Sequence, residues 1–355
     1  MKVKSYLKEY EVEFCPDFSF LSKTRYVENA FYIIDKKVYQ IYEEQLRECV
    51  GNSPYYLLEA VETNKNIDMV LKIIDQMVEM KSKRNTVLVS VGGGIVQDVS
   101  GFIANILYRG ISWIWIPTTL LAQADSCIGS KTSLNYKNYK NLLGYFYPPD
   151  KIYISTGFIG SLERRDYLSG LGEIMKCAIM AGTNSFCSTK KHLPELLEGK
   201  EEVLAEEIKK ALEFKKAVIE VDEFDTDTRN IMNYGHTFGH ALESASCYAV
   251  PHGQAVSVGM LIANQISYSR GYIKEDLRAE MYNAIRSIVT EELLEREYFS
   301  SETYLAVLKK DKKYTGFTHT CILLDKGGEC VKRYKDITDA EIISACEEIL
   351  KSYNK

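Results

Sequence analysis

Residues 87–107 read VLVSVGGGIVQDVSGFIANIL. Val87 to Val91 form a short apolar run rich in β-branched residues, three glycines follow, and the apolar residues from Ile95 onward recur at helical spacing. This pattern predicts a strand, a tight glycine turn and a helix. Glycines let a backbone approach a ligand closely, and amides at a helix start attract phosphate. The turn therefore suits a dinucleotide pyrophosphate, although it is not the G-x-G-x-x-G pattern and a plain tight turn is the other interpretation.

Working outward, short apolar runs alternate with helical patterns through the first 155 residues. The strand candidates are residues 30–34, 86–91, 111–116 and 152–154. This alternation predicts an α/β fold with a parallel sheet. Beyond residue 155 the pattern is mainly helical, as in residues 201–221 and 339–353, where apolar residues recur three and four apart. We therefore expect an α/β domain over residues 1–155 and an all-helical domain over residues 156–355.

The composition limits the class of protein. The chain has 355 residues, of which 46% are apolar, enough for a sizeable core. A net charge of -5 without a long basic run argues against nucleic acid as a partner and leaves small anionic ligands open. No N-terminal apolar segment and no uncharged apolar run of about 18 residues is present, so we expect a cytoplasmic protein without membrane association. The nine cysteines are scattered without a C-x-x-C pair, which indicates reduced, mostly buried thiols.

Three of the five histidines lie within residues 236–252, and they mark a metal site. His236 and His240 are four residues apart, so they share one face of a helix, and His252 can return from the next segment. A carboxylate is the expected additional ligand type. Spacing alone favours His236 and His240 together as ligands.

Several other polar residues can be interpreted either as part of a binding site or as ordinary structural residues. The segment after residue 116 carries Asp125 and Lys131 in a loop beyond a parallel strand, where open α/β sheets bind ligands, but a solvated connection is the alternative. Glu173 and Lys176 are three apart in an apolar helix, and a surface ion pair is the ordinary meaning of that spacing. Asp35 follows the first strand and could bind a ribose hydroxyl or simply cap a turn.

Taken together, these segments resemble the 3-dehydroquinate synthases of the sugar phosphate cyclase superfamily. The islands of resemblance occur in this order: Gly92-Gly93-Gly94 with Asp98, Tyr108-Arg109-Gly110, Pro117-Thr118-Thr119-Leu-Leu, Asp125 to Thr132, Lys140-Asn141, Gly172-Glu173-x-x-Lys176, Asp222-Glu223, Arg229, Asn233-x-Gly-His236-Thr-x-Gly-His240, and His252-Gly253. The resemblance covers roughly residues 30–320 and keeps the spacing between islands. It implies an N-terminal NAD-binding α/β domain, a C-terminal helical domain that binds metal and substrate, and an active site between them.

The resemblance also implies individual roles. Glu173, His236 and His252 would bind zinc, or cobalt, and His240 would face the substrate instead, which corrects the inference from spacing. The cofactor positions would be Asp35, Glu62, Lys65, Gly93, Gly94, Asp98, Thr118, Thr119 and Lys140. The phosphate pocket would comprise Lys131, Asn141, Asn233, His240 and a lysine of the pair Lys312 and Lys313. Arg109 would join that pocket from a neighbouring subunit, which implies a homodimer. Lys215 and Arg229 would grip a substrate carboxylate, while Asp125 and Lys176 would hold ring hydroxyls and metal-bound oxygens.

The implied activity is the conversion of 3-deoxy-D-arabino-heptulosonate 7-phosphate to 3-dehydroquinate and phosphate, a step of the shikimate pathway to aromatic amino acids. Transient oxidation by NAD, β-elimination of phosphate, reduction and intramolecular aldol closure make up the reaction, so NAD is not consumed. Since a substrate lacking a carboxylate would leave Lys215 and Arg229 unpaired, their presence favours the carboxylated substrate.

Four positions depart from the usual pattern of these enzymes: Gln97, Gly172, Ser130 and Gln254. Residues 135–141 also resemble relatives that cyclise sedoheptulose 7-phosphate, and an amino-dehydroquinate synthase is a further alternative within the superfamily. A metal-dependent polyol dehydrogenase would share the architecture and NAD, but would accumulate NADH. A non-catalytic descendant would have lost a ligand or the basic pocket, and here every implied ligand is present.

Overall fold

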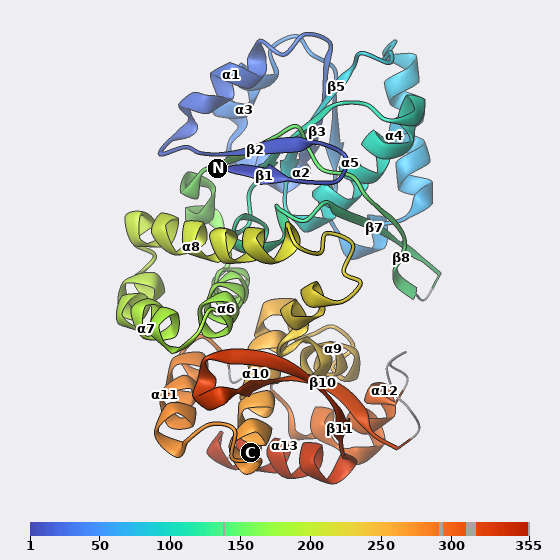
Figure 1. The fold of residues 1–355 in the computed structure, drawn as a ribbon. Coiled ribbons are helices and arrows are strands. Elements are labelled where there is room, and N and C mark those ends of the chain that lie inside the picture. Colours follow the sequence, from blue (N-terminus) through green and yellow to red (C-terminus); the bar gives the residue numbers. More distant parts are fainter. Residues whose placement is uncertain (138, 291–293, 310–316, 354–355) are drawn as a thin grey trace. The chain divides into compact units, whose positions relative to one another are not determined.

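The computed structural model describes residues 1–137, 139–290, 294–309 and 317–353. The chain forms two compact units (Figure 1). The first unit comprises Met1–Leu162 together with Lys215–Asp225, and the second comprises Glu163–Phe214 together with Thr226–Lys355. The division therefore falls inside helix α8 (Glu201–Ile219), whose last residues belong to the first unit.

A seven-stranded sheet is the centre of the first unit, with strand order β1-β2-β9-β6-β5-β3-β4. Its strands are β1 (Lys2–Lys4), β2 (Glu9–Phe14), β3 (Ala30–Asp35), β4 (Tyr55–Leu58), β5 (Val87–Gly92), β6 (Trp113–Pro117) and β9 (Lys151–Ile154). Only β1 and β2 pair antiparallel, and every other neighbouring pair is parallel. The strands predicted at residues 30–34, 86–91, 111–116 and 152–154 are thus confirmed as β3, β5, β6 and β9, and the parallel sheet is confirmed with them.

Helices and one hairpin complete the first unit. The helices are α1 (Leu21–Arg25), α2 (Lys36–Ile41), α3 (Glu43–Val50), α4 (Ile67–Glu79) and α5 (Gly94–Ile106), and the antiparallel hairpin is β7 (Lys131–Tyr136) with β8 (Tyr139–Phe146). Helix α5 begins two residues after β5 ends, so the strand, glycine turn and helix predicted from residues 87–107 are present. Trp113, Trp115, Tyr32 and Phe31 are among the largest buried side chains of this unit and form the sheet's apolar core.

The second unit is mainly helical. Besides the start of α8 it contains α6 (Arg164–Met180), α7 (Thr183–Glu198), α9 (His236–Ala245), α10 (His252–Ser269), α11 (Glu275–Arg286), α12 (Ala306–Leu308) and α13 (Asp339–Ser352). The helices predicted at 201–221 and 339–353 are confirmed as α8 and α13. A two-stranded antiparallel hairpin, β10 (His319–Asp325) with β11 (Cys330–Ile337), is an exception to the all-helical expectation. Because β10 is buried along almost its whole length, it lacks the alternation of polar and apolar residues that reveals a strand.

Several segments form single short turns. In the first unit these are η1 (Phe18–Phe20), η2 (Glu62–Asn64), η3 (Leu107–Arg109), the π-turn η4 (Ala122–Ser126) and η5 (Thr156–Ser161). In the second unit they are η6 (Thr228–Asn233), η8 (Arg296–Phe299), the π-turn η9 (Ser301–Leu305) and η10 (Lys326–Gly328).

Helix α10 is the central helix of the second unit. Its residues from Gly253 to Asn264 are all buried, and α6, α9, α11, α13 and β10 pack around it. Two glycines allow unusually close approach. A Cβ atom on Gly172 of α6 would lie 2.5 Å from the Gly253 carbonyl oxygen, and one on Gly259 would lie 2.0 Å from the Gly235 carbonyl oxygen. The absence of side chains at these points therefore brings α6 and α9 against the first half of α10.

All nine cysteines are thiols rather than disulfides, and six of them are buried, as the scattered pattern predicts. Among the described residues, no helix combines the length and the apolar character that crossing a membrane requires.

Candidate metal and cofactor sites

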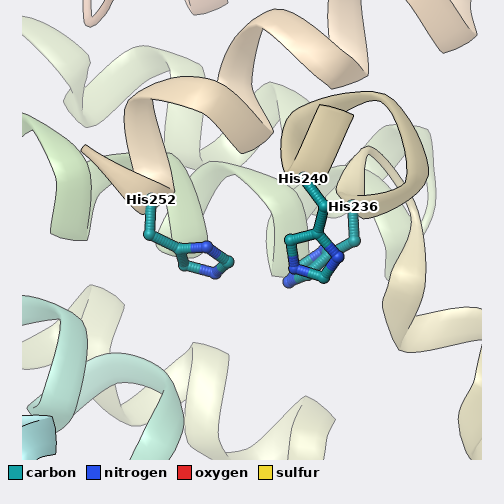
Figure 2. A group of neighbouring side chains, drawn as sticks. All are labelled: His236, His240 and His252. Carbon is teal, nitrogen blue, oxygen red and sulfur yellow. The ribbon is translucent and has the colours of Figure 1, made fainter. Parts of the chain in front are cut away.

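Three histidines converge in the second unit (Figure 2). His236 and His240 extend from α9 and His252 from the first turn of α10, and one ring nitrogen of each lies within 4.8 Å of the others. Gly235 in the left-handed region, with φ of 77°, turns the chain into α9 just before His236. The sequence-predicted cluster is therefore a cluster in space.

Glu173 adds a carboxylate from α6. Its Oε1 atom lies 3.8 Å from His236 Nε2 and 3.6 Å from His252 Nε2. The residue is fully buried, and neither carboxylate oxygen accepts a hydrogen bond from the described residues. Lys176 Nζ, one turn further along α6, lies 2.5 Å from Oε2 and balances the charge rather than forming a well-aligned hydrogen bond. Oε1 is left without a partner among the described residues, and such an oxygen of a buried carboxylate is costly unless a further cation binds it.

The neighbouring groups orient both imidazoles. His236 Nδ1 contacts the Tyr234 carbonyl oxygen at 3.2 Å, and His252 Nδ1 contacts Glu243 Oε2 at 3.1 Å. In each ring this arrangement turns Nε2 toward Glu173, as the partners of metal-bound histidines commonly do. Burial, with the charge of Lys176, holds the pKa of His236 well below its ordinary value, so this ring is neutral and able to bind metal. Burial alone would lower the pKa of His252, but its hydrogen bond to Glu243 raises it.

The donor set fits a divalent transition metal. Two ligand atoms about 2.1 Å from zinc in tetrahedral geometry lie about 3.4 Å apart. The separations of 3.6 and 3.8 Å between Glu173 Oε1 and the two Nε2 atoms are close to that value. His240 is the more exposed histidine, with 58% of its side chain accessible, so it suits a contact to a bound molecule better than a closed metal position.

In the first unit, the predicted cofactor residues gather at the carboxyl ends of three adjacent strands. Asp35 ends β3, Gly93 and Gly94 follow β5, and Thr118 and Thr119 follow β6. Because these strands are parallel neighbours, their ends form one edge, where open α/β sheets bind ligands. Gly93 is the N-cap of α5, so amides of its first turn face this edge. Asp35 caps α2 by accepting a hydrogen bond from the Lys37 amide at 2.9 Å.

The other predicted cofactor residues form a polar network. Lys65 Nζ pairs with Asp98 Oδ2 at 2.5 Å and donates to Asn141 Oδ1 at 2.6 Å. Burial raises the pKa of Asp98, against the opposing charge of Lys65. Glu62 Oε1 lies 3.8 Å from Lys140 Nζ, which brings Lys140 to the same group. The structure thus places Asn141, predicted for the phosphate pocket, beside the predicted cofactor positions.

Two further lysines of the first unit are paired with carboxylates. Lys215 Nζ lies 2.9 Å from Asp125 Oδ1 and 2.8 Å from the Asp125 carbonyl oxygen. Lys131 Nζ lies 2.6 Å from Asp225 Oδ2. The two basic residues were predicted for different parts of the substrate, and both belong to the first unit together with Asp125.

The remaining predicted residues are more scattered. Arg109 is exposed at a turn, with φ of 67°. Arg229 is buried in η6, and Asn233 at the end of η6 donates to the Asn230 carbonyl oxygen at 3.0 Å. Lys312 and Lys313 lie outside the described residues.

Sequence reasoning missed Glu243, which contacts His252 Nδ1 at 3.1 Å. The sequence did contain a signal for this contact: Glu243 lies three residues after His240 on a predicted helix, so the two side chains share one face. It also missed Asp225 as the partner of Lys131, because a charged segment ordinarily indicates only an exposed surface.

The chain matches the family model for the N-terminal part of 3-dehydroquinate synthase over residues 55–169 and that for the C-terminal part over residues 170–314. The 3-dehydroquinate synthase of Thermoanaerobacter sp. (strain X514) is 35% identical over 291 residues, which are 80% of this chain and 81% of that protein.

Two solved structures share the fold. They are 2-epi-5-epi-valiolone synthase from Streptomyces hygroscopicus subsp. jinggangensis 5008 with NAD+ and Zn2+ bound, and 2-deoxy-scyllo-inosose synthase complexed with carbaglucose-6-phosphate, NAD+ and Co2+. Their TM-scores are 0.86 and 0.87, each at 24% identity, and each match covers 98% of this chain and 99% of the other. With both family models matched in order over 260 residues, the chain belongs to the 3-dehydroquinate synthase family.

Proposed function

We propose that the chain is a NAD- and metal-dependent sugar phosphate cyclase that converts 3-deoxy-D-arabino-heptulosonate 7-phosphate to 3-dehydroquinate and phosphate. The observation that carries the proposal is the buried carboxylate of Glu173, whose Oε1 atom has no hydrogen-bond partner among the described residues and faces two oriented imidazoles. Membership of the 3-dehydroquinate synthase family supplies the reaction that such a site serves.

Glu173, His236 and His252 would hold the metal, which fits zinc or cobalt because its donors are a carboxylate and two imidazoles. The strand-end residues of β3, β5 and β6 would hold NAD, with the first turn of α5 toward its phosphates. When bound, NAD supplies reversible hydride transfer, and the metal supplies polarisation of substrate oxygens. The redox steps cancel, so no net NADH forms.

The basic side chains would bind the substrate's two anionic groups. Lys131 carries an ammonium group on a half-exposed side chain, and its bond to Asp225 can be exchanged for one to a phosphate. Arg229 is a buried guanidinium in the second unit, and its planar fork suits a carboxylate. Asp125 would accept a hydrogen bond from a ring hydroxyl. Asn141, Asn233 and His240, with Lys312 or Lys313, would complete the phosphate pocket.

The ion pair between Lys215 and Asp125 favours a second candidate reaction, the cyclisation of a sugar phosphate without a carboxylate. Lys215 is paired with Asp125 and therefore does not need a substrate carboxylate to balance its charge. Substrates without a carboxylate, such as sedoheptulose 7-phosphate, are thus the alternative within the same chemistry. The greater similarity to 3-dehydroquinate synthases, at 35% identity against 24% for the solved structures, favours the carboxylated substrate.

Substitution of Arg229 tests this choice. We expect Arg229→Met to lower kcat/KM for the carboxylated heptulosonate phosphate by at least about 30-fold, because loss of a buried charged partner costs about 2–5 kcal/mol. A lysine at the same place, in Arg229→Lys, should recover part of the activity. An unchanged kcat/KM in Arg229→Met would remove the carboxylate from the proposed substrate. A homodimer, with Arg109 reaching the phosphate pocket of a second copy, and a cytoplasmic location stay predictions.

A further inference from the structure

We propose that Gln97 is a positioning residue that holds the Asp125 turn and one end of the Lys131 loop in place for the phosphorylated substrate. The inference rests on the proposed function, since Asp125 and Lys131 are substrate-binding residues only in that reaction. All the residues involved lie in the first unit.

Gln97 forms a reciprocal pair of hydrogen bonds with one residue. Its Nε2 donates to the Ser126 carbonyl oxygen at 2.9 Å, and its Oε1 accepts from Ser126 Oγ at 2.7 Å. Only 5% of Gln97 is exposed, so water cannot readily replace these bonds. The side-chain amide therefore fixes both the position and the hydroxyl orientation of Ser126.

Ser126 ends the π-turn η4, which contains Asp125. The last carbonyl groups of a helical turn have no partner within it, and here two successive ones are bound by side chains. Lys215 donates to the Asp125 carbonyl oxygen and Gln97 to that of Ser126. Turns with π geometry often occur at functional sites. Gln97 thus stabilises the turn that directs Asp125.

The residue next to Gln97 holds the other end of the Lys131 loop. Asp98 Oδ1 accepts from the Ser133 amide at 2.9 Å, while Gln97 holds Ser126. Two consecutive residues of α5 therefore anchor the eight-residue segment 126–133 at both ends, and this segment runs from the turn into the start of β7. Within it Ser130 has φ of 63°, a conformation that is strained for a serine. Lys131 follows Ser130 directly, so the two anchors help to set the place at which its side chain leaves the backbone.

The contact between Gln97 and Ser126 links the helix that begins at the predicted NAD site to the residues predicted to contact the sugar phosphate.

The test uses the metal- and NAD-loaded protein and the variant Gln97→Met, which keeps side-chain length but removes both hydrogen bonds. Gln76→Met is the matched control, because Gln76 on α4 also donates one hydrogen bond to a backbone oxygen, that of Tyr55 at 3.1 Å. We expect Gln97→Met to raise KM for the sugar phosphate about tenfold and to leave the dissociation constant for NAD within about twofold. Gln76→Met should change neither.

Ser126→Ala provides a second variant should Gln97→Met fold poorly. If Gln97 acts through Ser126, the double variant should raise KM no further than Gln97→Met alone. An unchanged KM in a folded Gln97→Met, or fully additive effects of the two substitutions, would overturn the proposal.

Hydrogen exchange separates this inference from the proposed function. Amides of residues 122–133 should exchange at least about tenfold faster in Gln97→Met than in the parent, with no change in Gln76→Met. This readout does not depend on activity. Faster exchange in a protein that turns over no sugar phosphate would uphold the positioning of the loop and refute the proposed reaction, whereas unchanged exchange would refute the role of Gln97.

Discussion

Gly172→Ala tests whether the close approach of α6 and α10 builds the metal site. The added Cβ would lie 2.5 Å from both the Gly253 carbonyl oxygen and Ser257 Oγ, whereas ordinary van der Waals contact begins at 3.4 Å. The difference is 0.9 Å. Ser257 can rotate its hydroxyl away, but the Gly253 oxygen belongs to the backbone of α10, so the two helices must move apart. Glu173 on α6 and His252 on α10 would move apart with them.

The magnitude follows from two opposing effects. Overpacking against a rigid backbone belongs at the upper end of the usual range, about 3 kcal/mol. Replacing glycine by alanine inside a helix returns about 1 kcal/mol through helix propensity. We therefore expect a net loss of about 2 kcal/mol, which lowers the thermal midpoint by about 5 °C for a unit of this size. Since metal ligands tolerate displacements of only about 0.2 Å, zinc affinity should fall at least about tenfold.

Zinc affinity is measured by competition with a chelating dye, and the thermal midpoint by circular dichroism of the metal-free protein. Gly160→Ala is the control, because a Cβ there meets no atom within 4 Å and the backbone needs no left-handed conformation. The reasoning would be refuted if Gly172→Ala bound zinc as tightly as the parent protein and unfolded at the same temperature.

Three further outcomes are expected. Burial alone would raise the pKa of Glu341, but hydrogen bonds from Arg270 and Thr338 lower this pKa to about 2. The stability that the ionised Glu341 contributes is therefore present above pH of about 4.5 and is lost as the pH falls toward 2. Arg270→Gln should therefore reduce the difference between the urea midpoints at about pH 6 and about pH 3; an unchanged difference would contradict this. Gln254 donates to the Ile288 carbonyl oxygen at 2.6 Å from a buried position, so Gln254→Glu should lower the free energy of unfolding by about 2 kcal/mol, measured by urea titration at neutral pH against the parent. Removal of divalent metal by a chelator should abolish turnover and lower the thermal midpoint. Added zinc at 100 times its dissociation constant should restore about 2.7 kcal/mol of the free energy of unfolding. A thermal midpoint that does not respond to zinc would exclude a metal site in the folded protein.

The strands β3, β5, β6 and β9 could be predicted because central parallel strands are buried on both faces and appear as continuous apolar runs. The hairpin strand β8 could not, since most of its side chains are exposed and no continuous apolar run marks it. Strand propensity depends strongly on a residue's surroundings.

The candidate site was likewise only partly predictable from the sequence. Three histidines within 17 residues are visible as a cluster in the sequence, and the structure brings them together. Glu173 lies more than 60 residues away in the chain, and only the resemblance connected it to them. Spacing favoured His240 because residues four apart share a helix face, but it carries no information about burial. The contacts of Gln97 and Glu243 were also hidden, because a sequence shows which groups are present and not where they point.

The most direct test of the account is turnover of 3-deoxy-D-arabino-heptulosonate 7-phosphate by the zinc-loaded protein with NAD far below the substrate concentration. Phosphate release is followed by a colorimetric assay, NADH by absorbance and the product by NMR, with sedoheptulose 7-phosphate assayed in parallel. The account predicts one phosphate per 3-dehydroquinate formed, many turnovers per NAD, and no accumulation of NADH. Turnover of sedoheptulose 7-phosphate alone, accumulation of NADH without phosphate, or no reaction with the carboxylated substrate would contradict it.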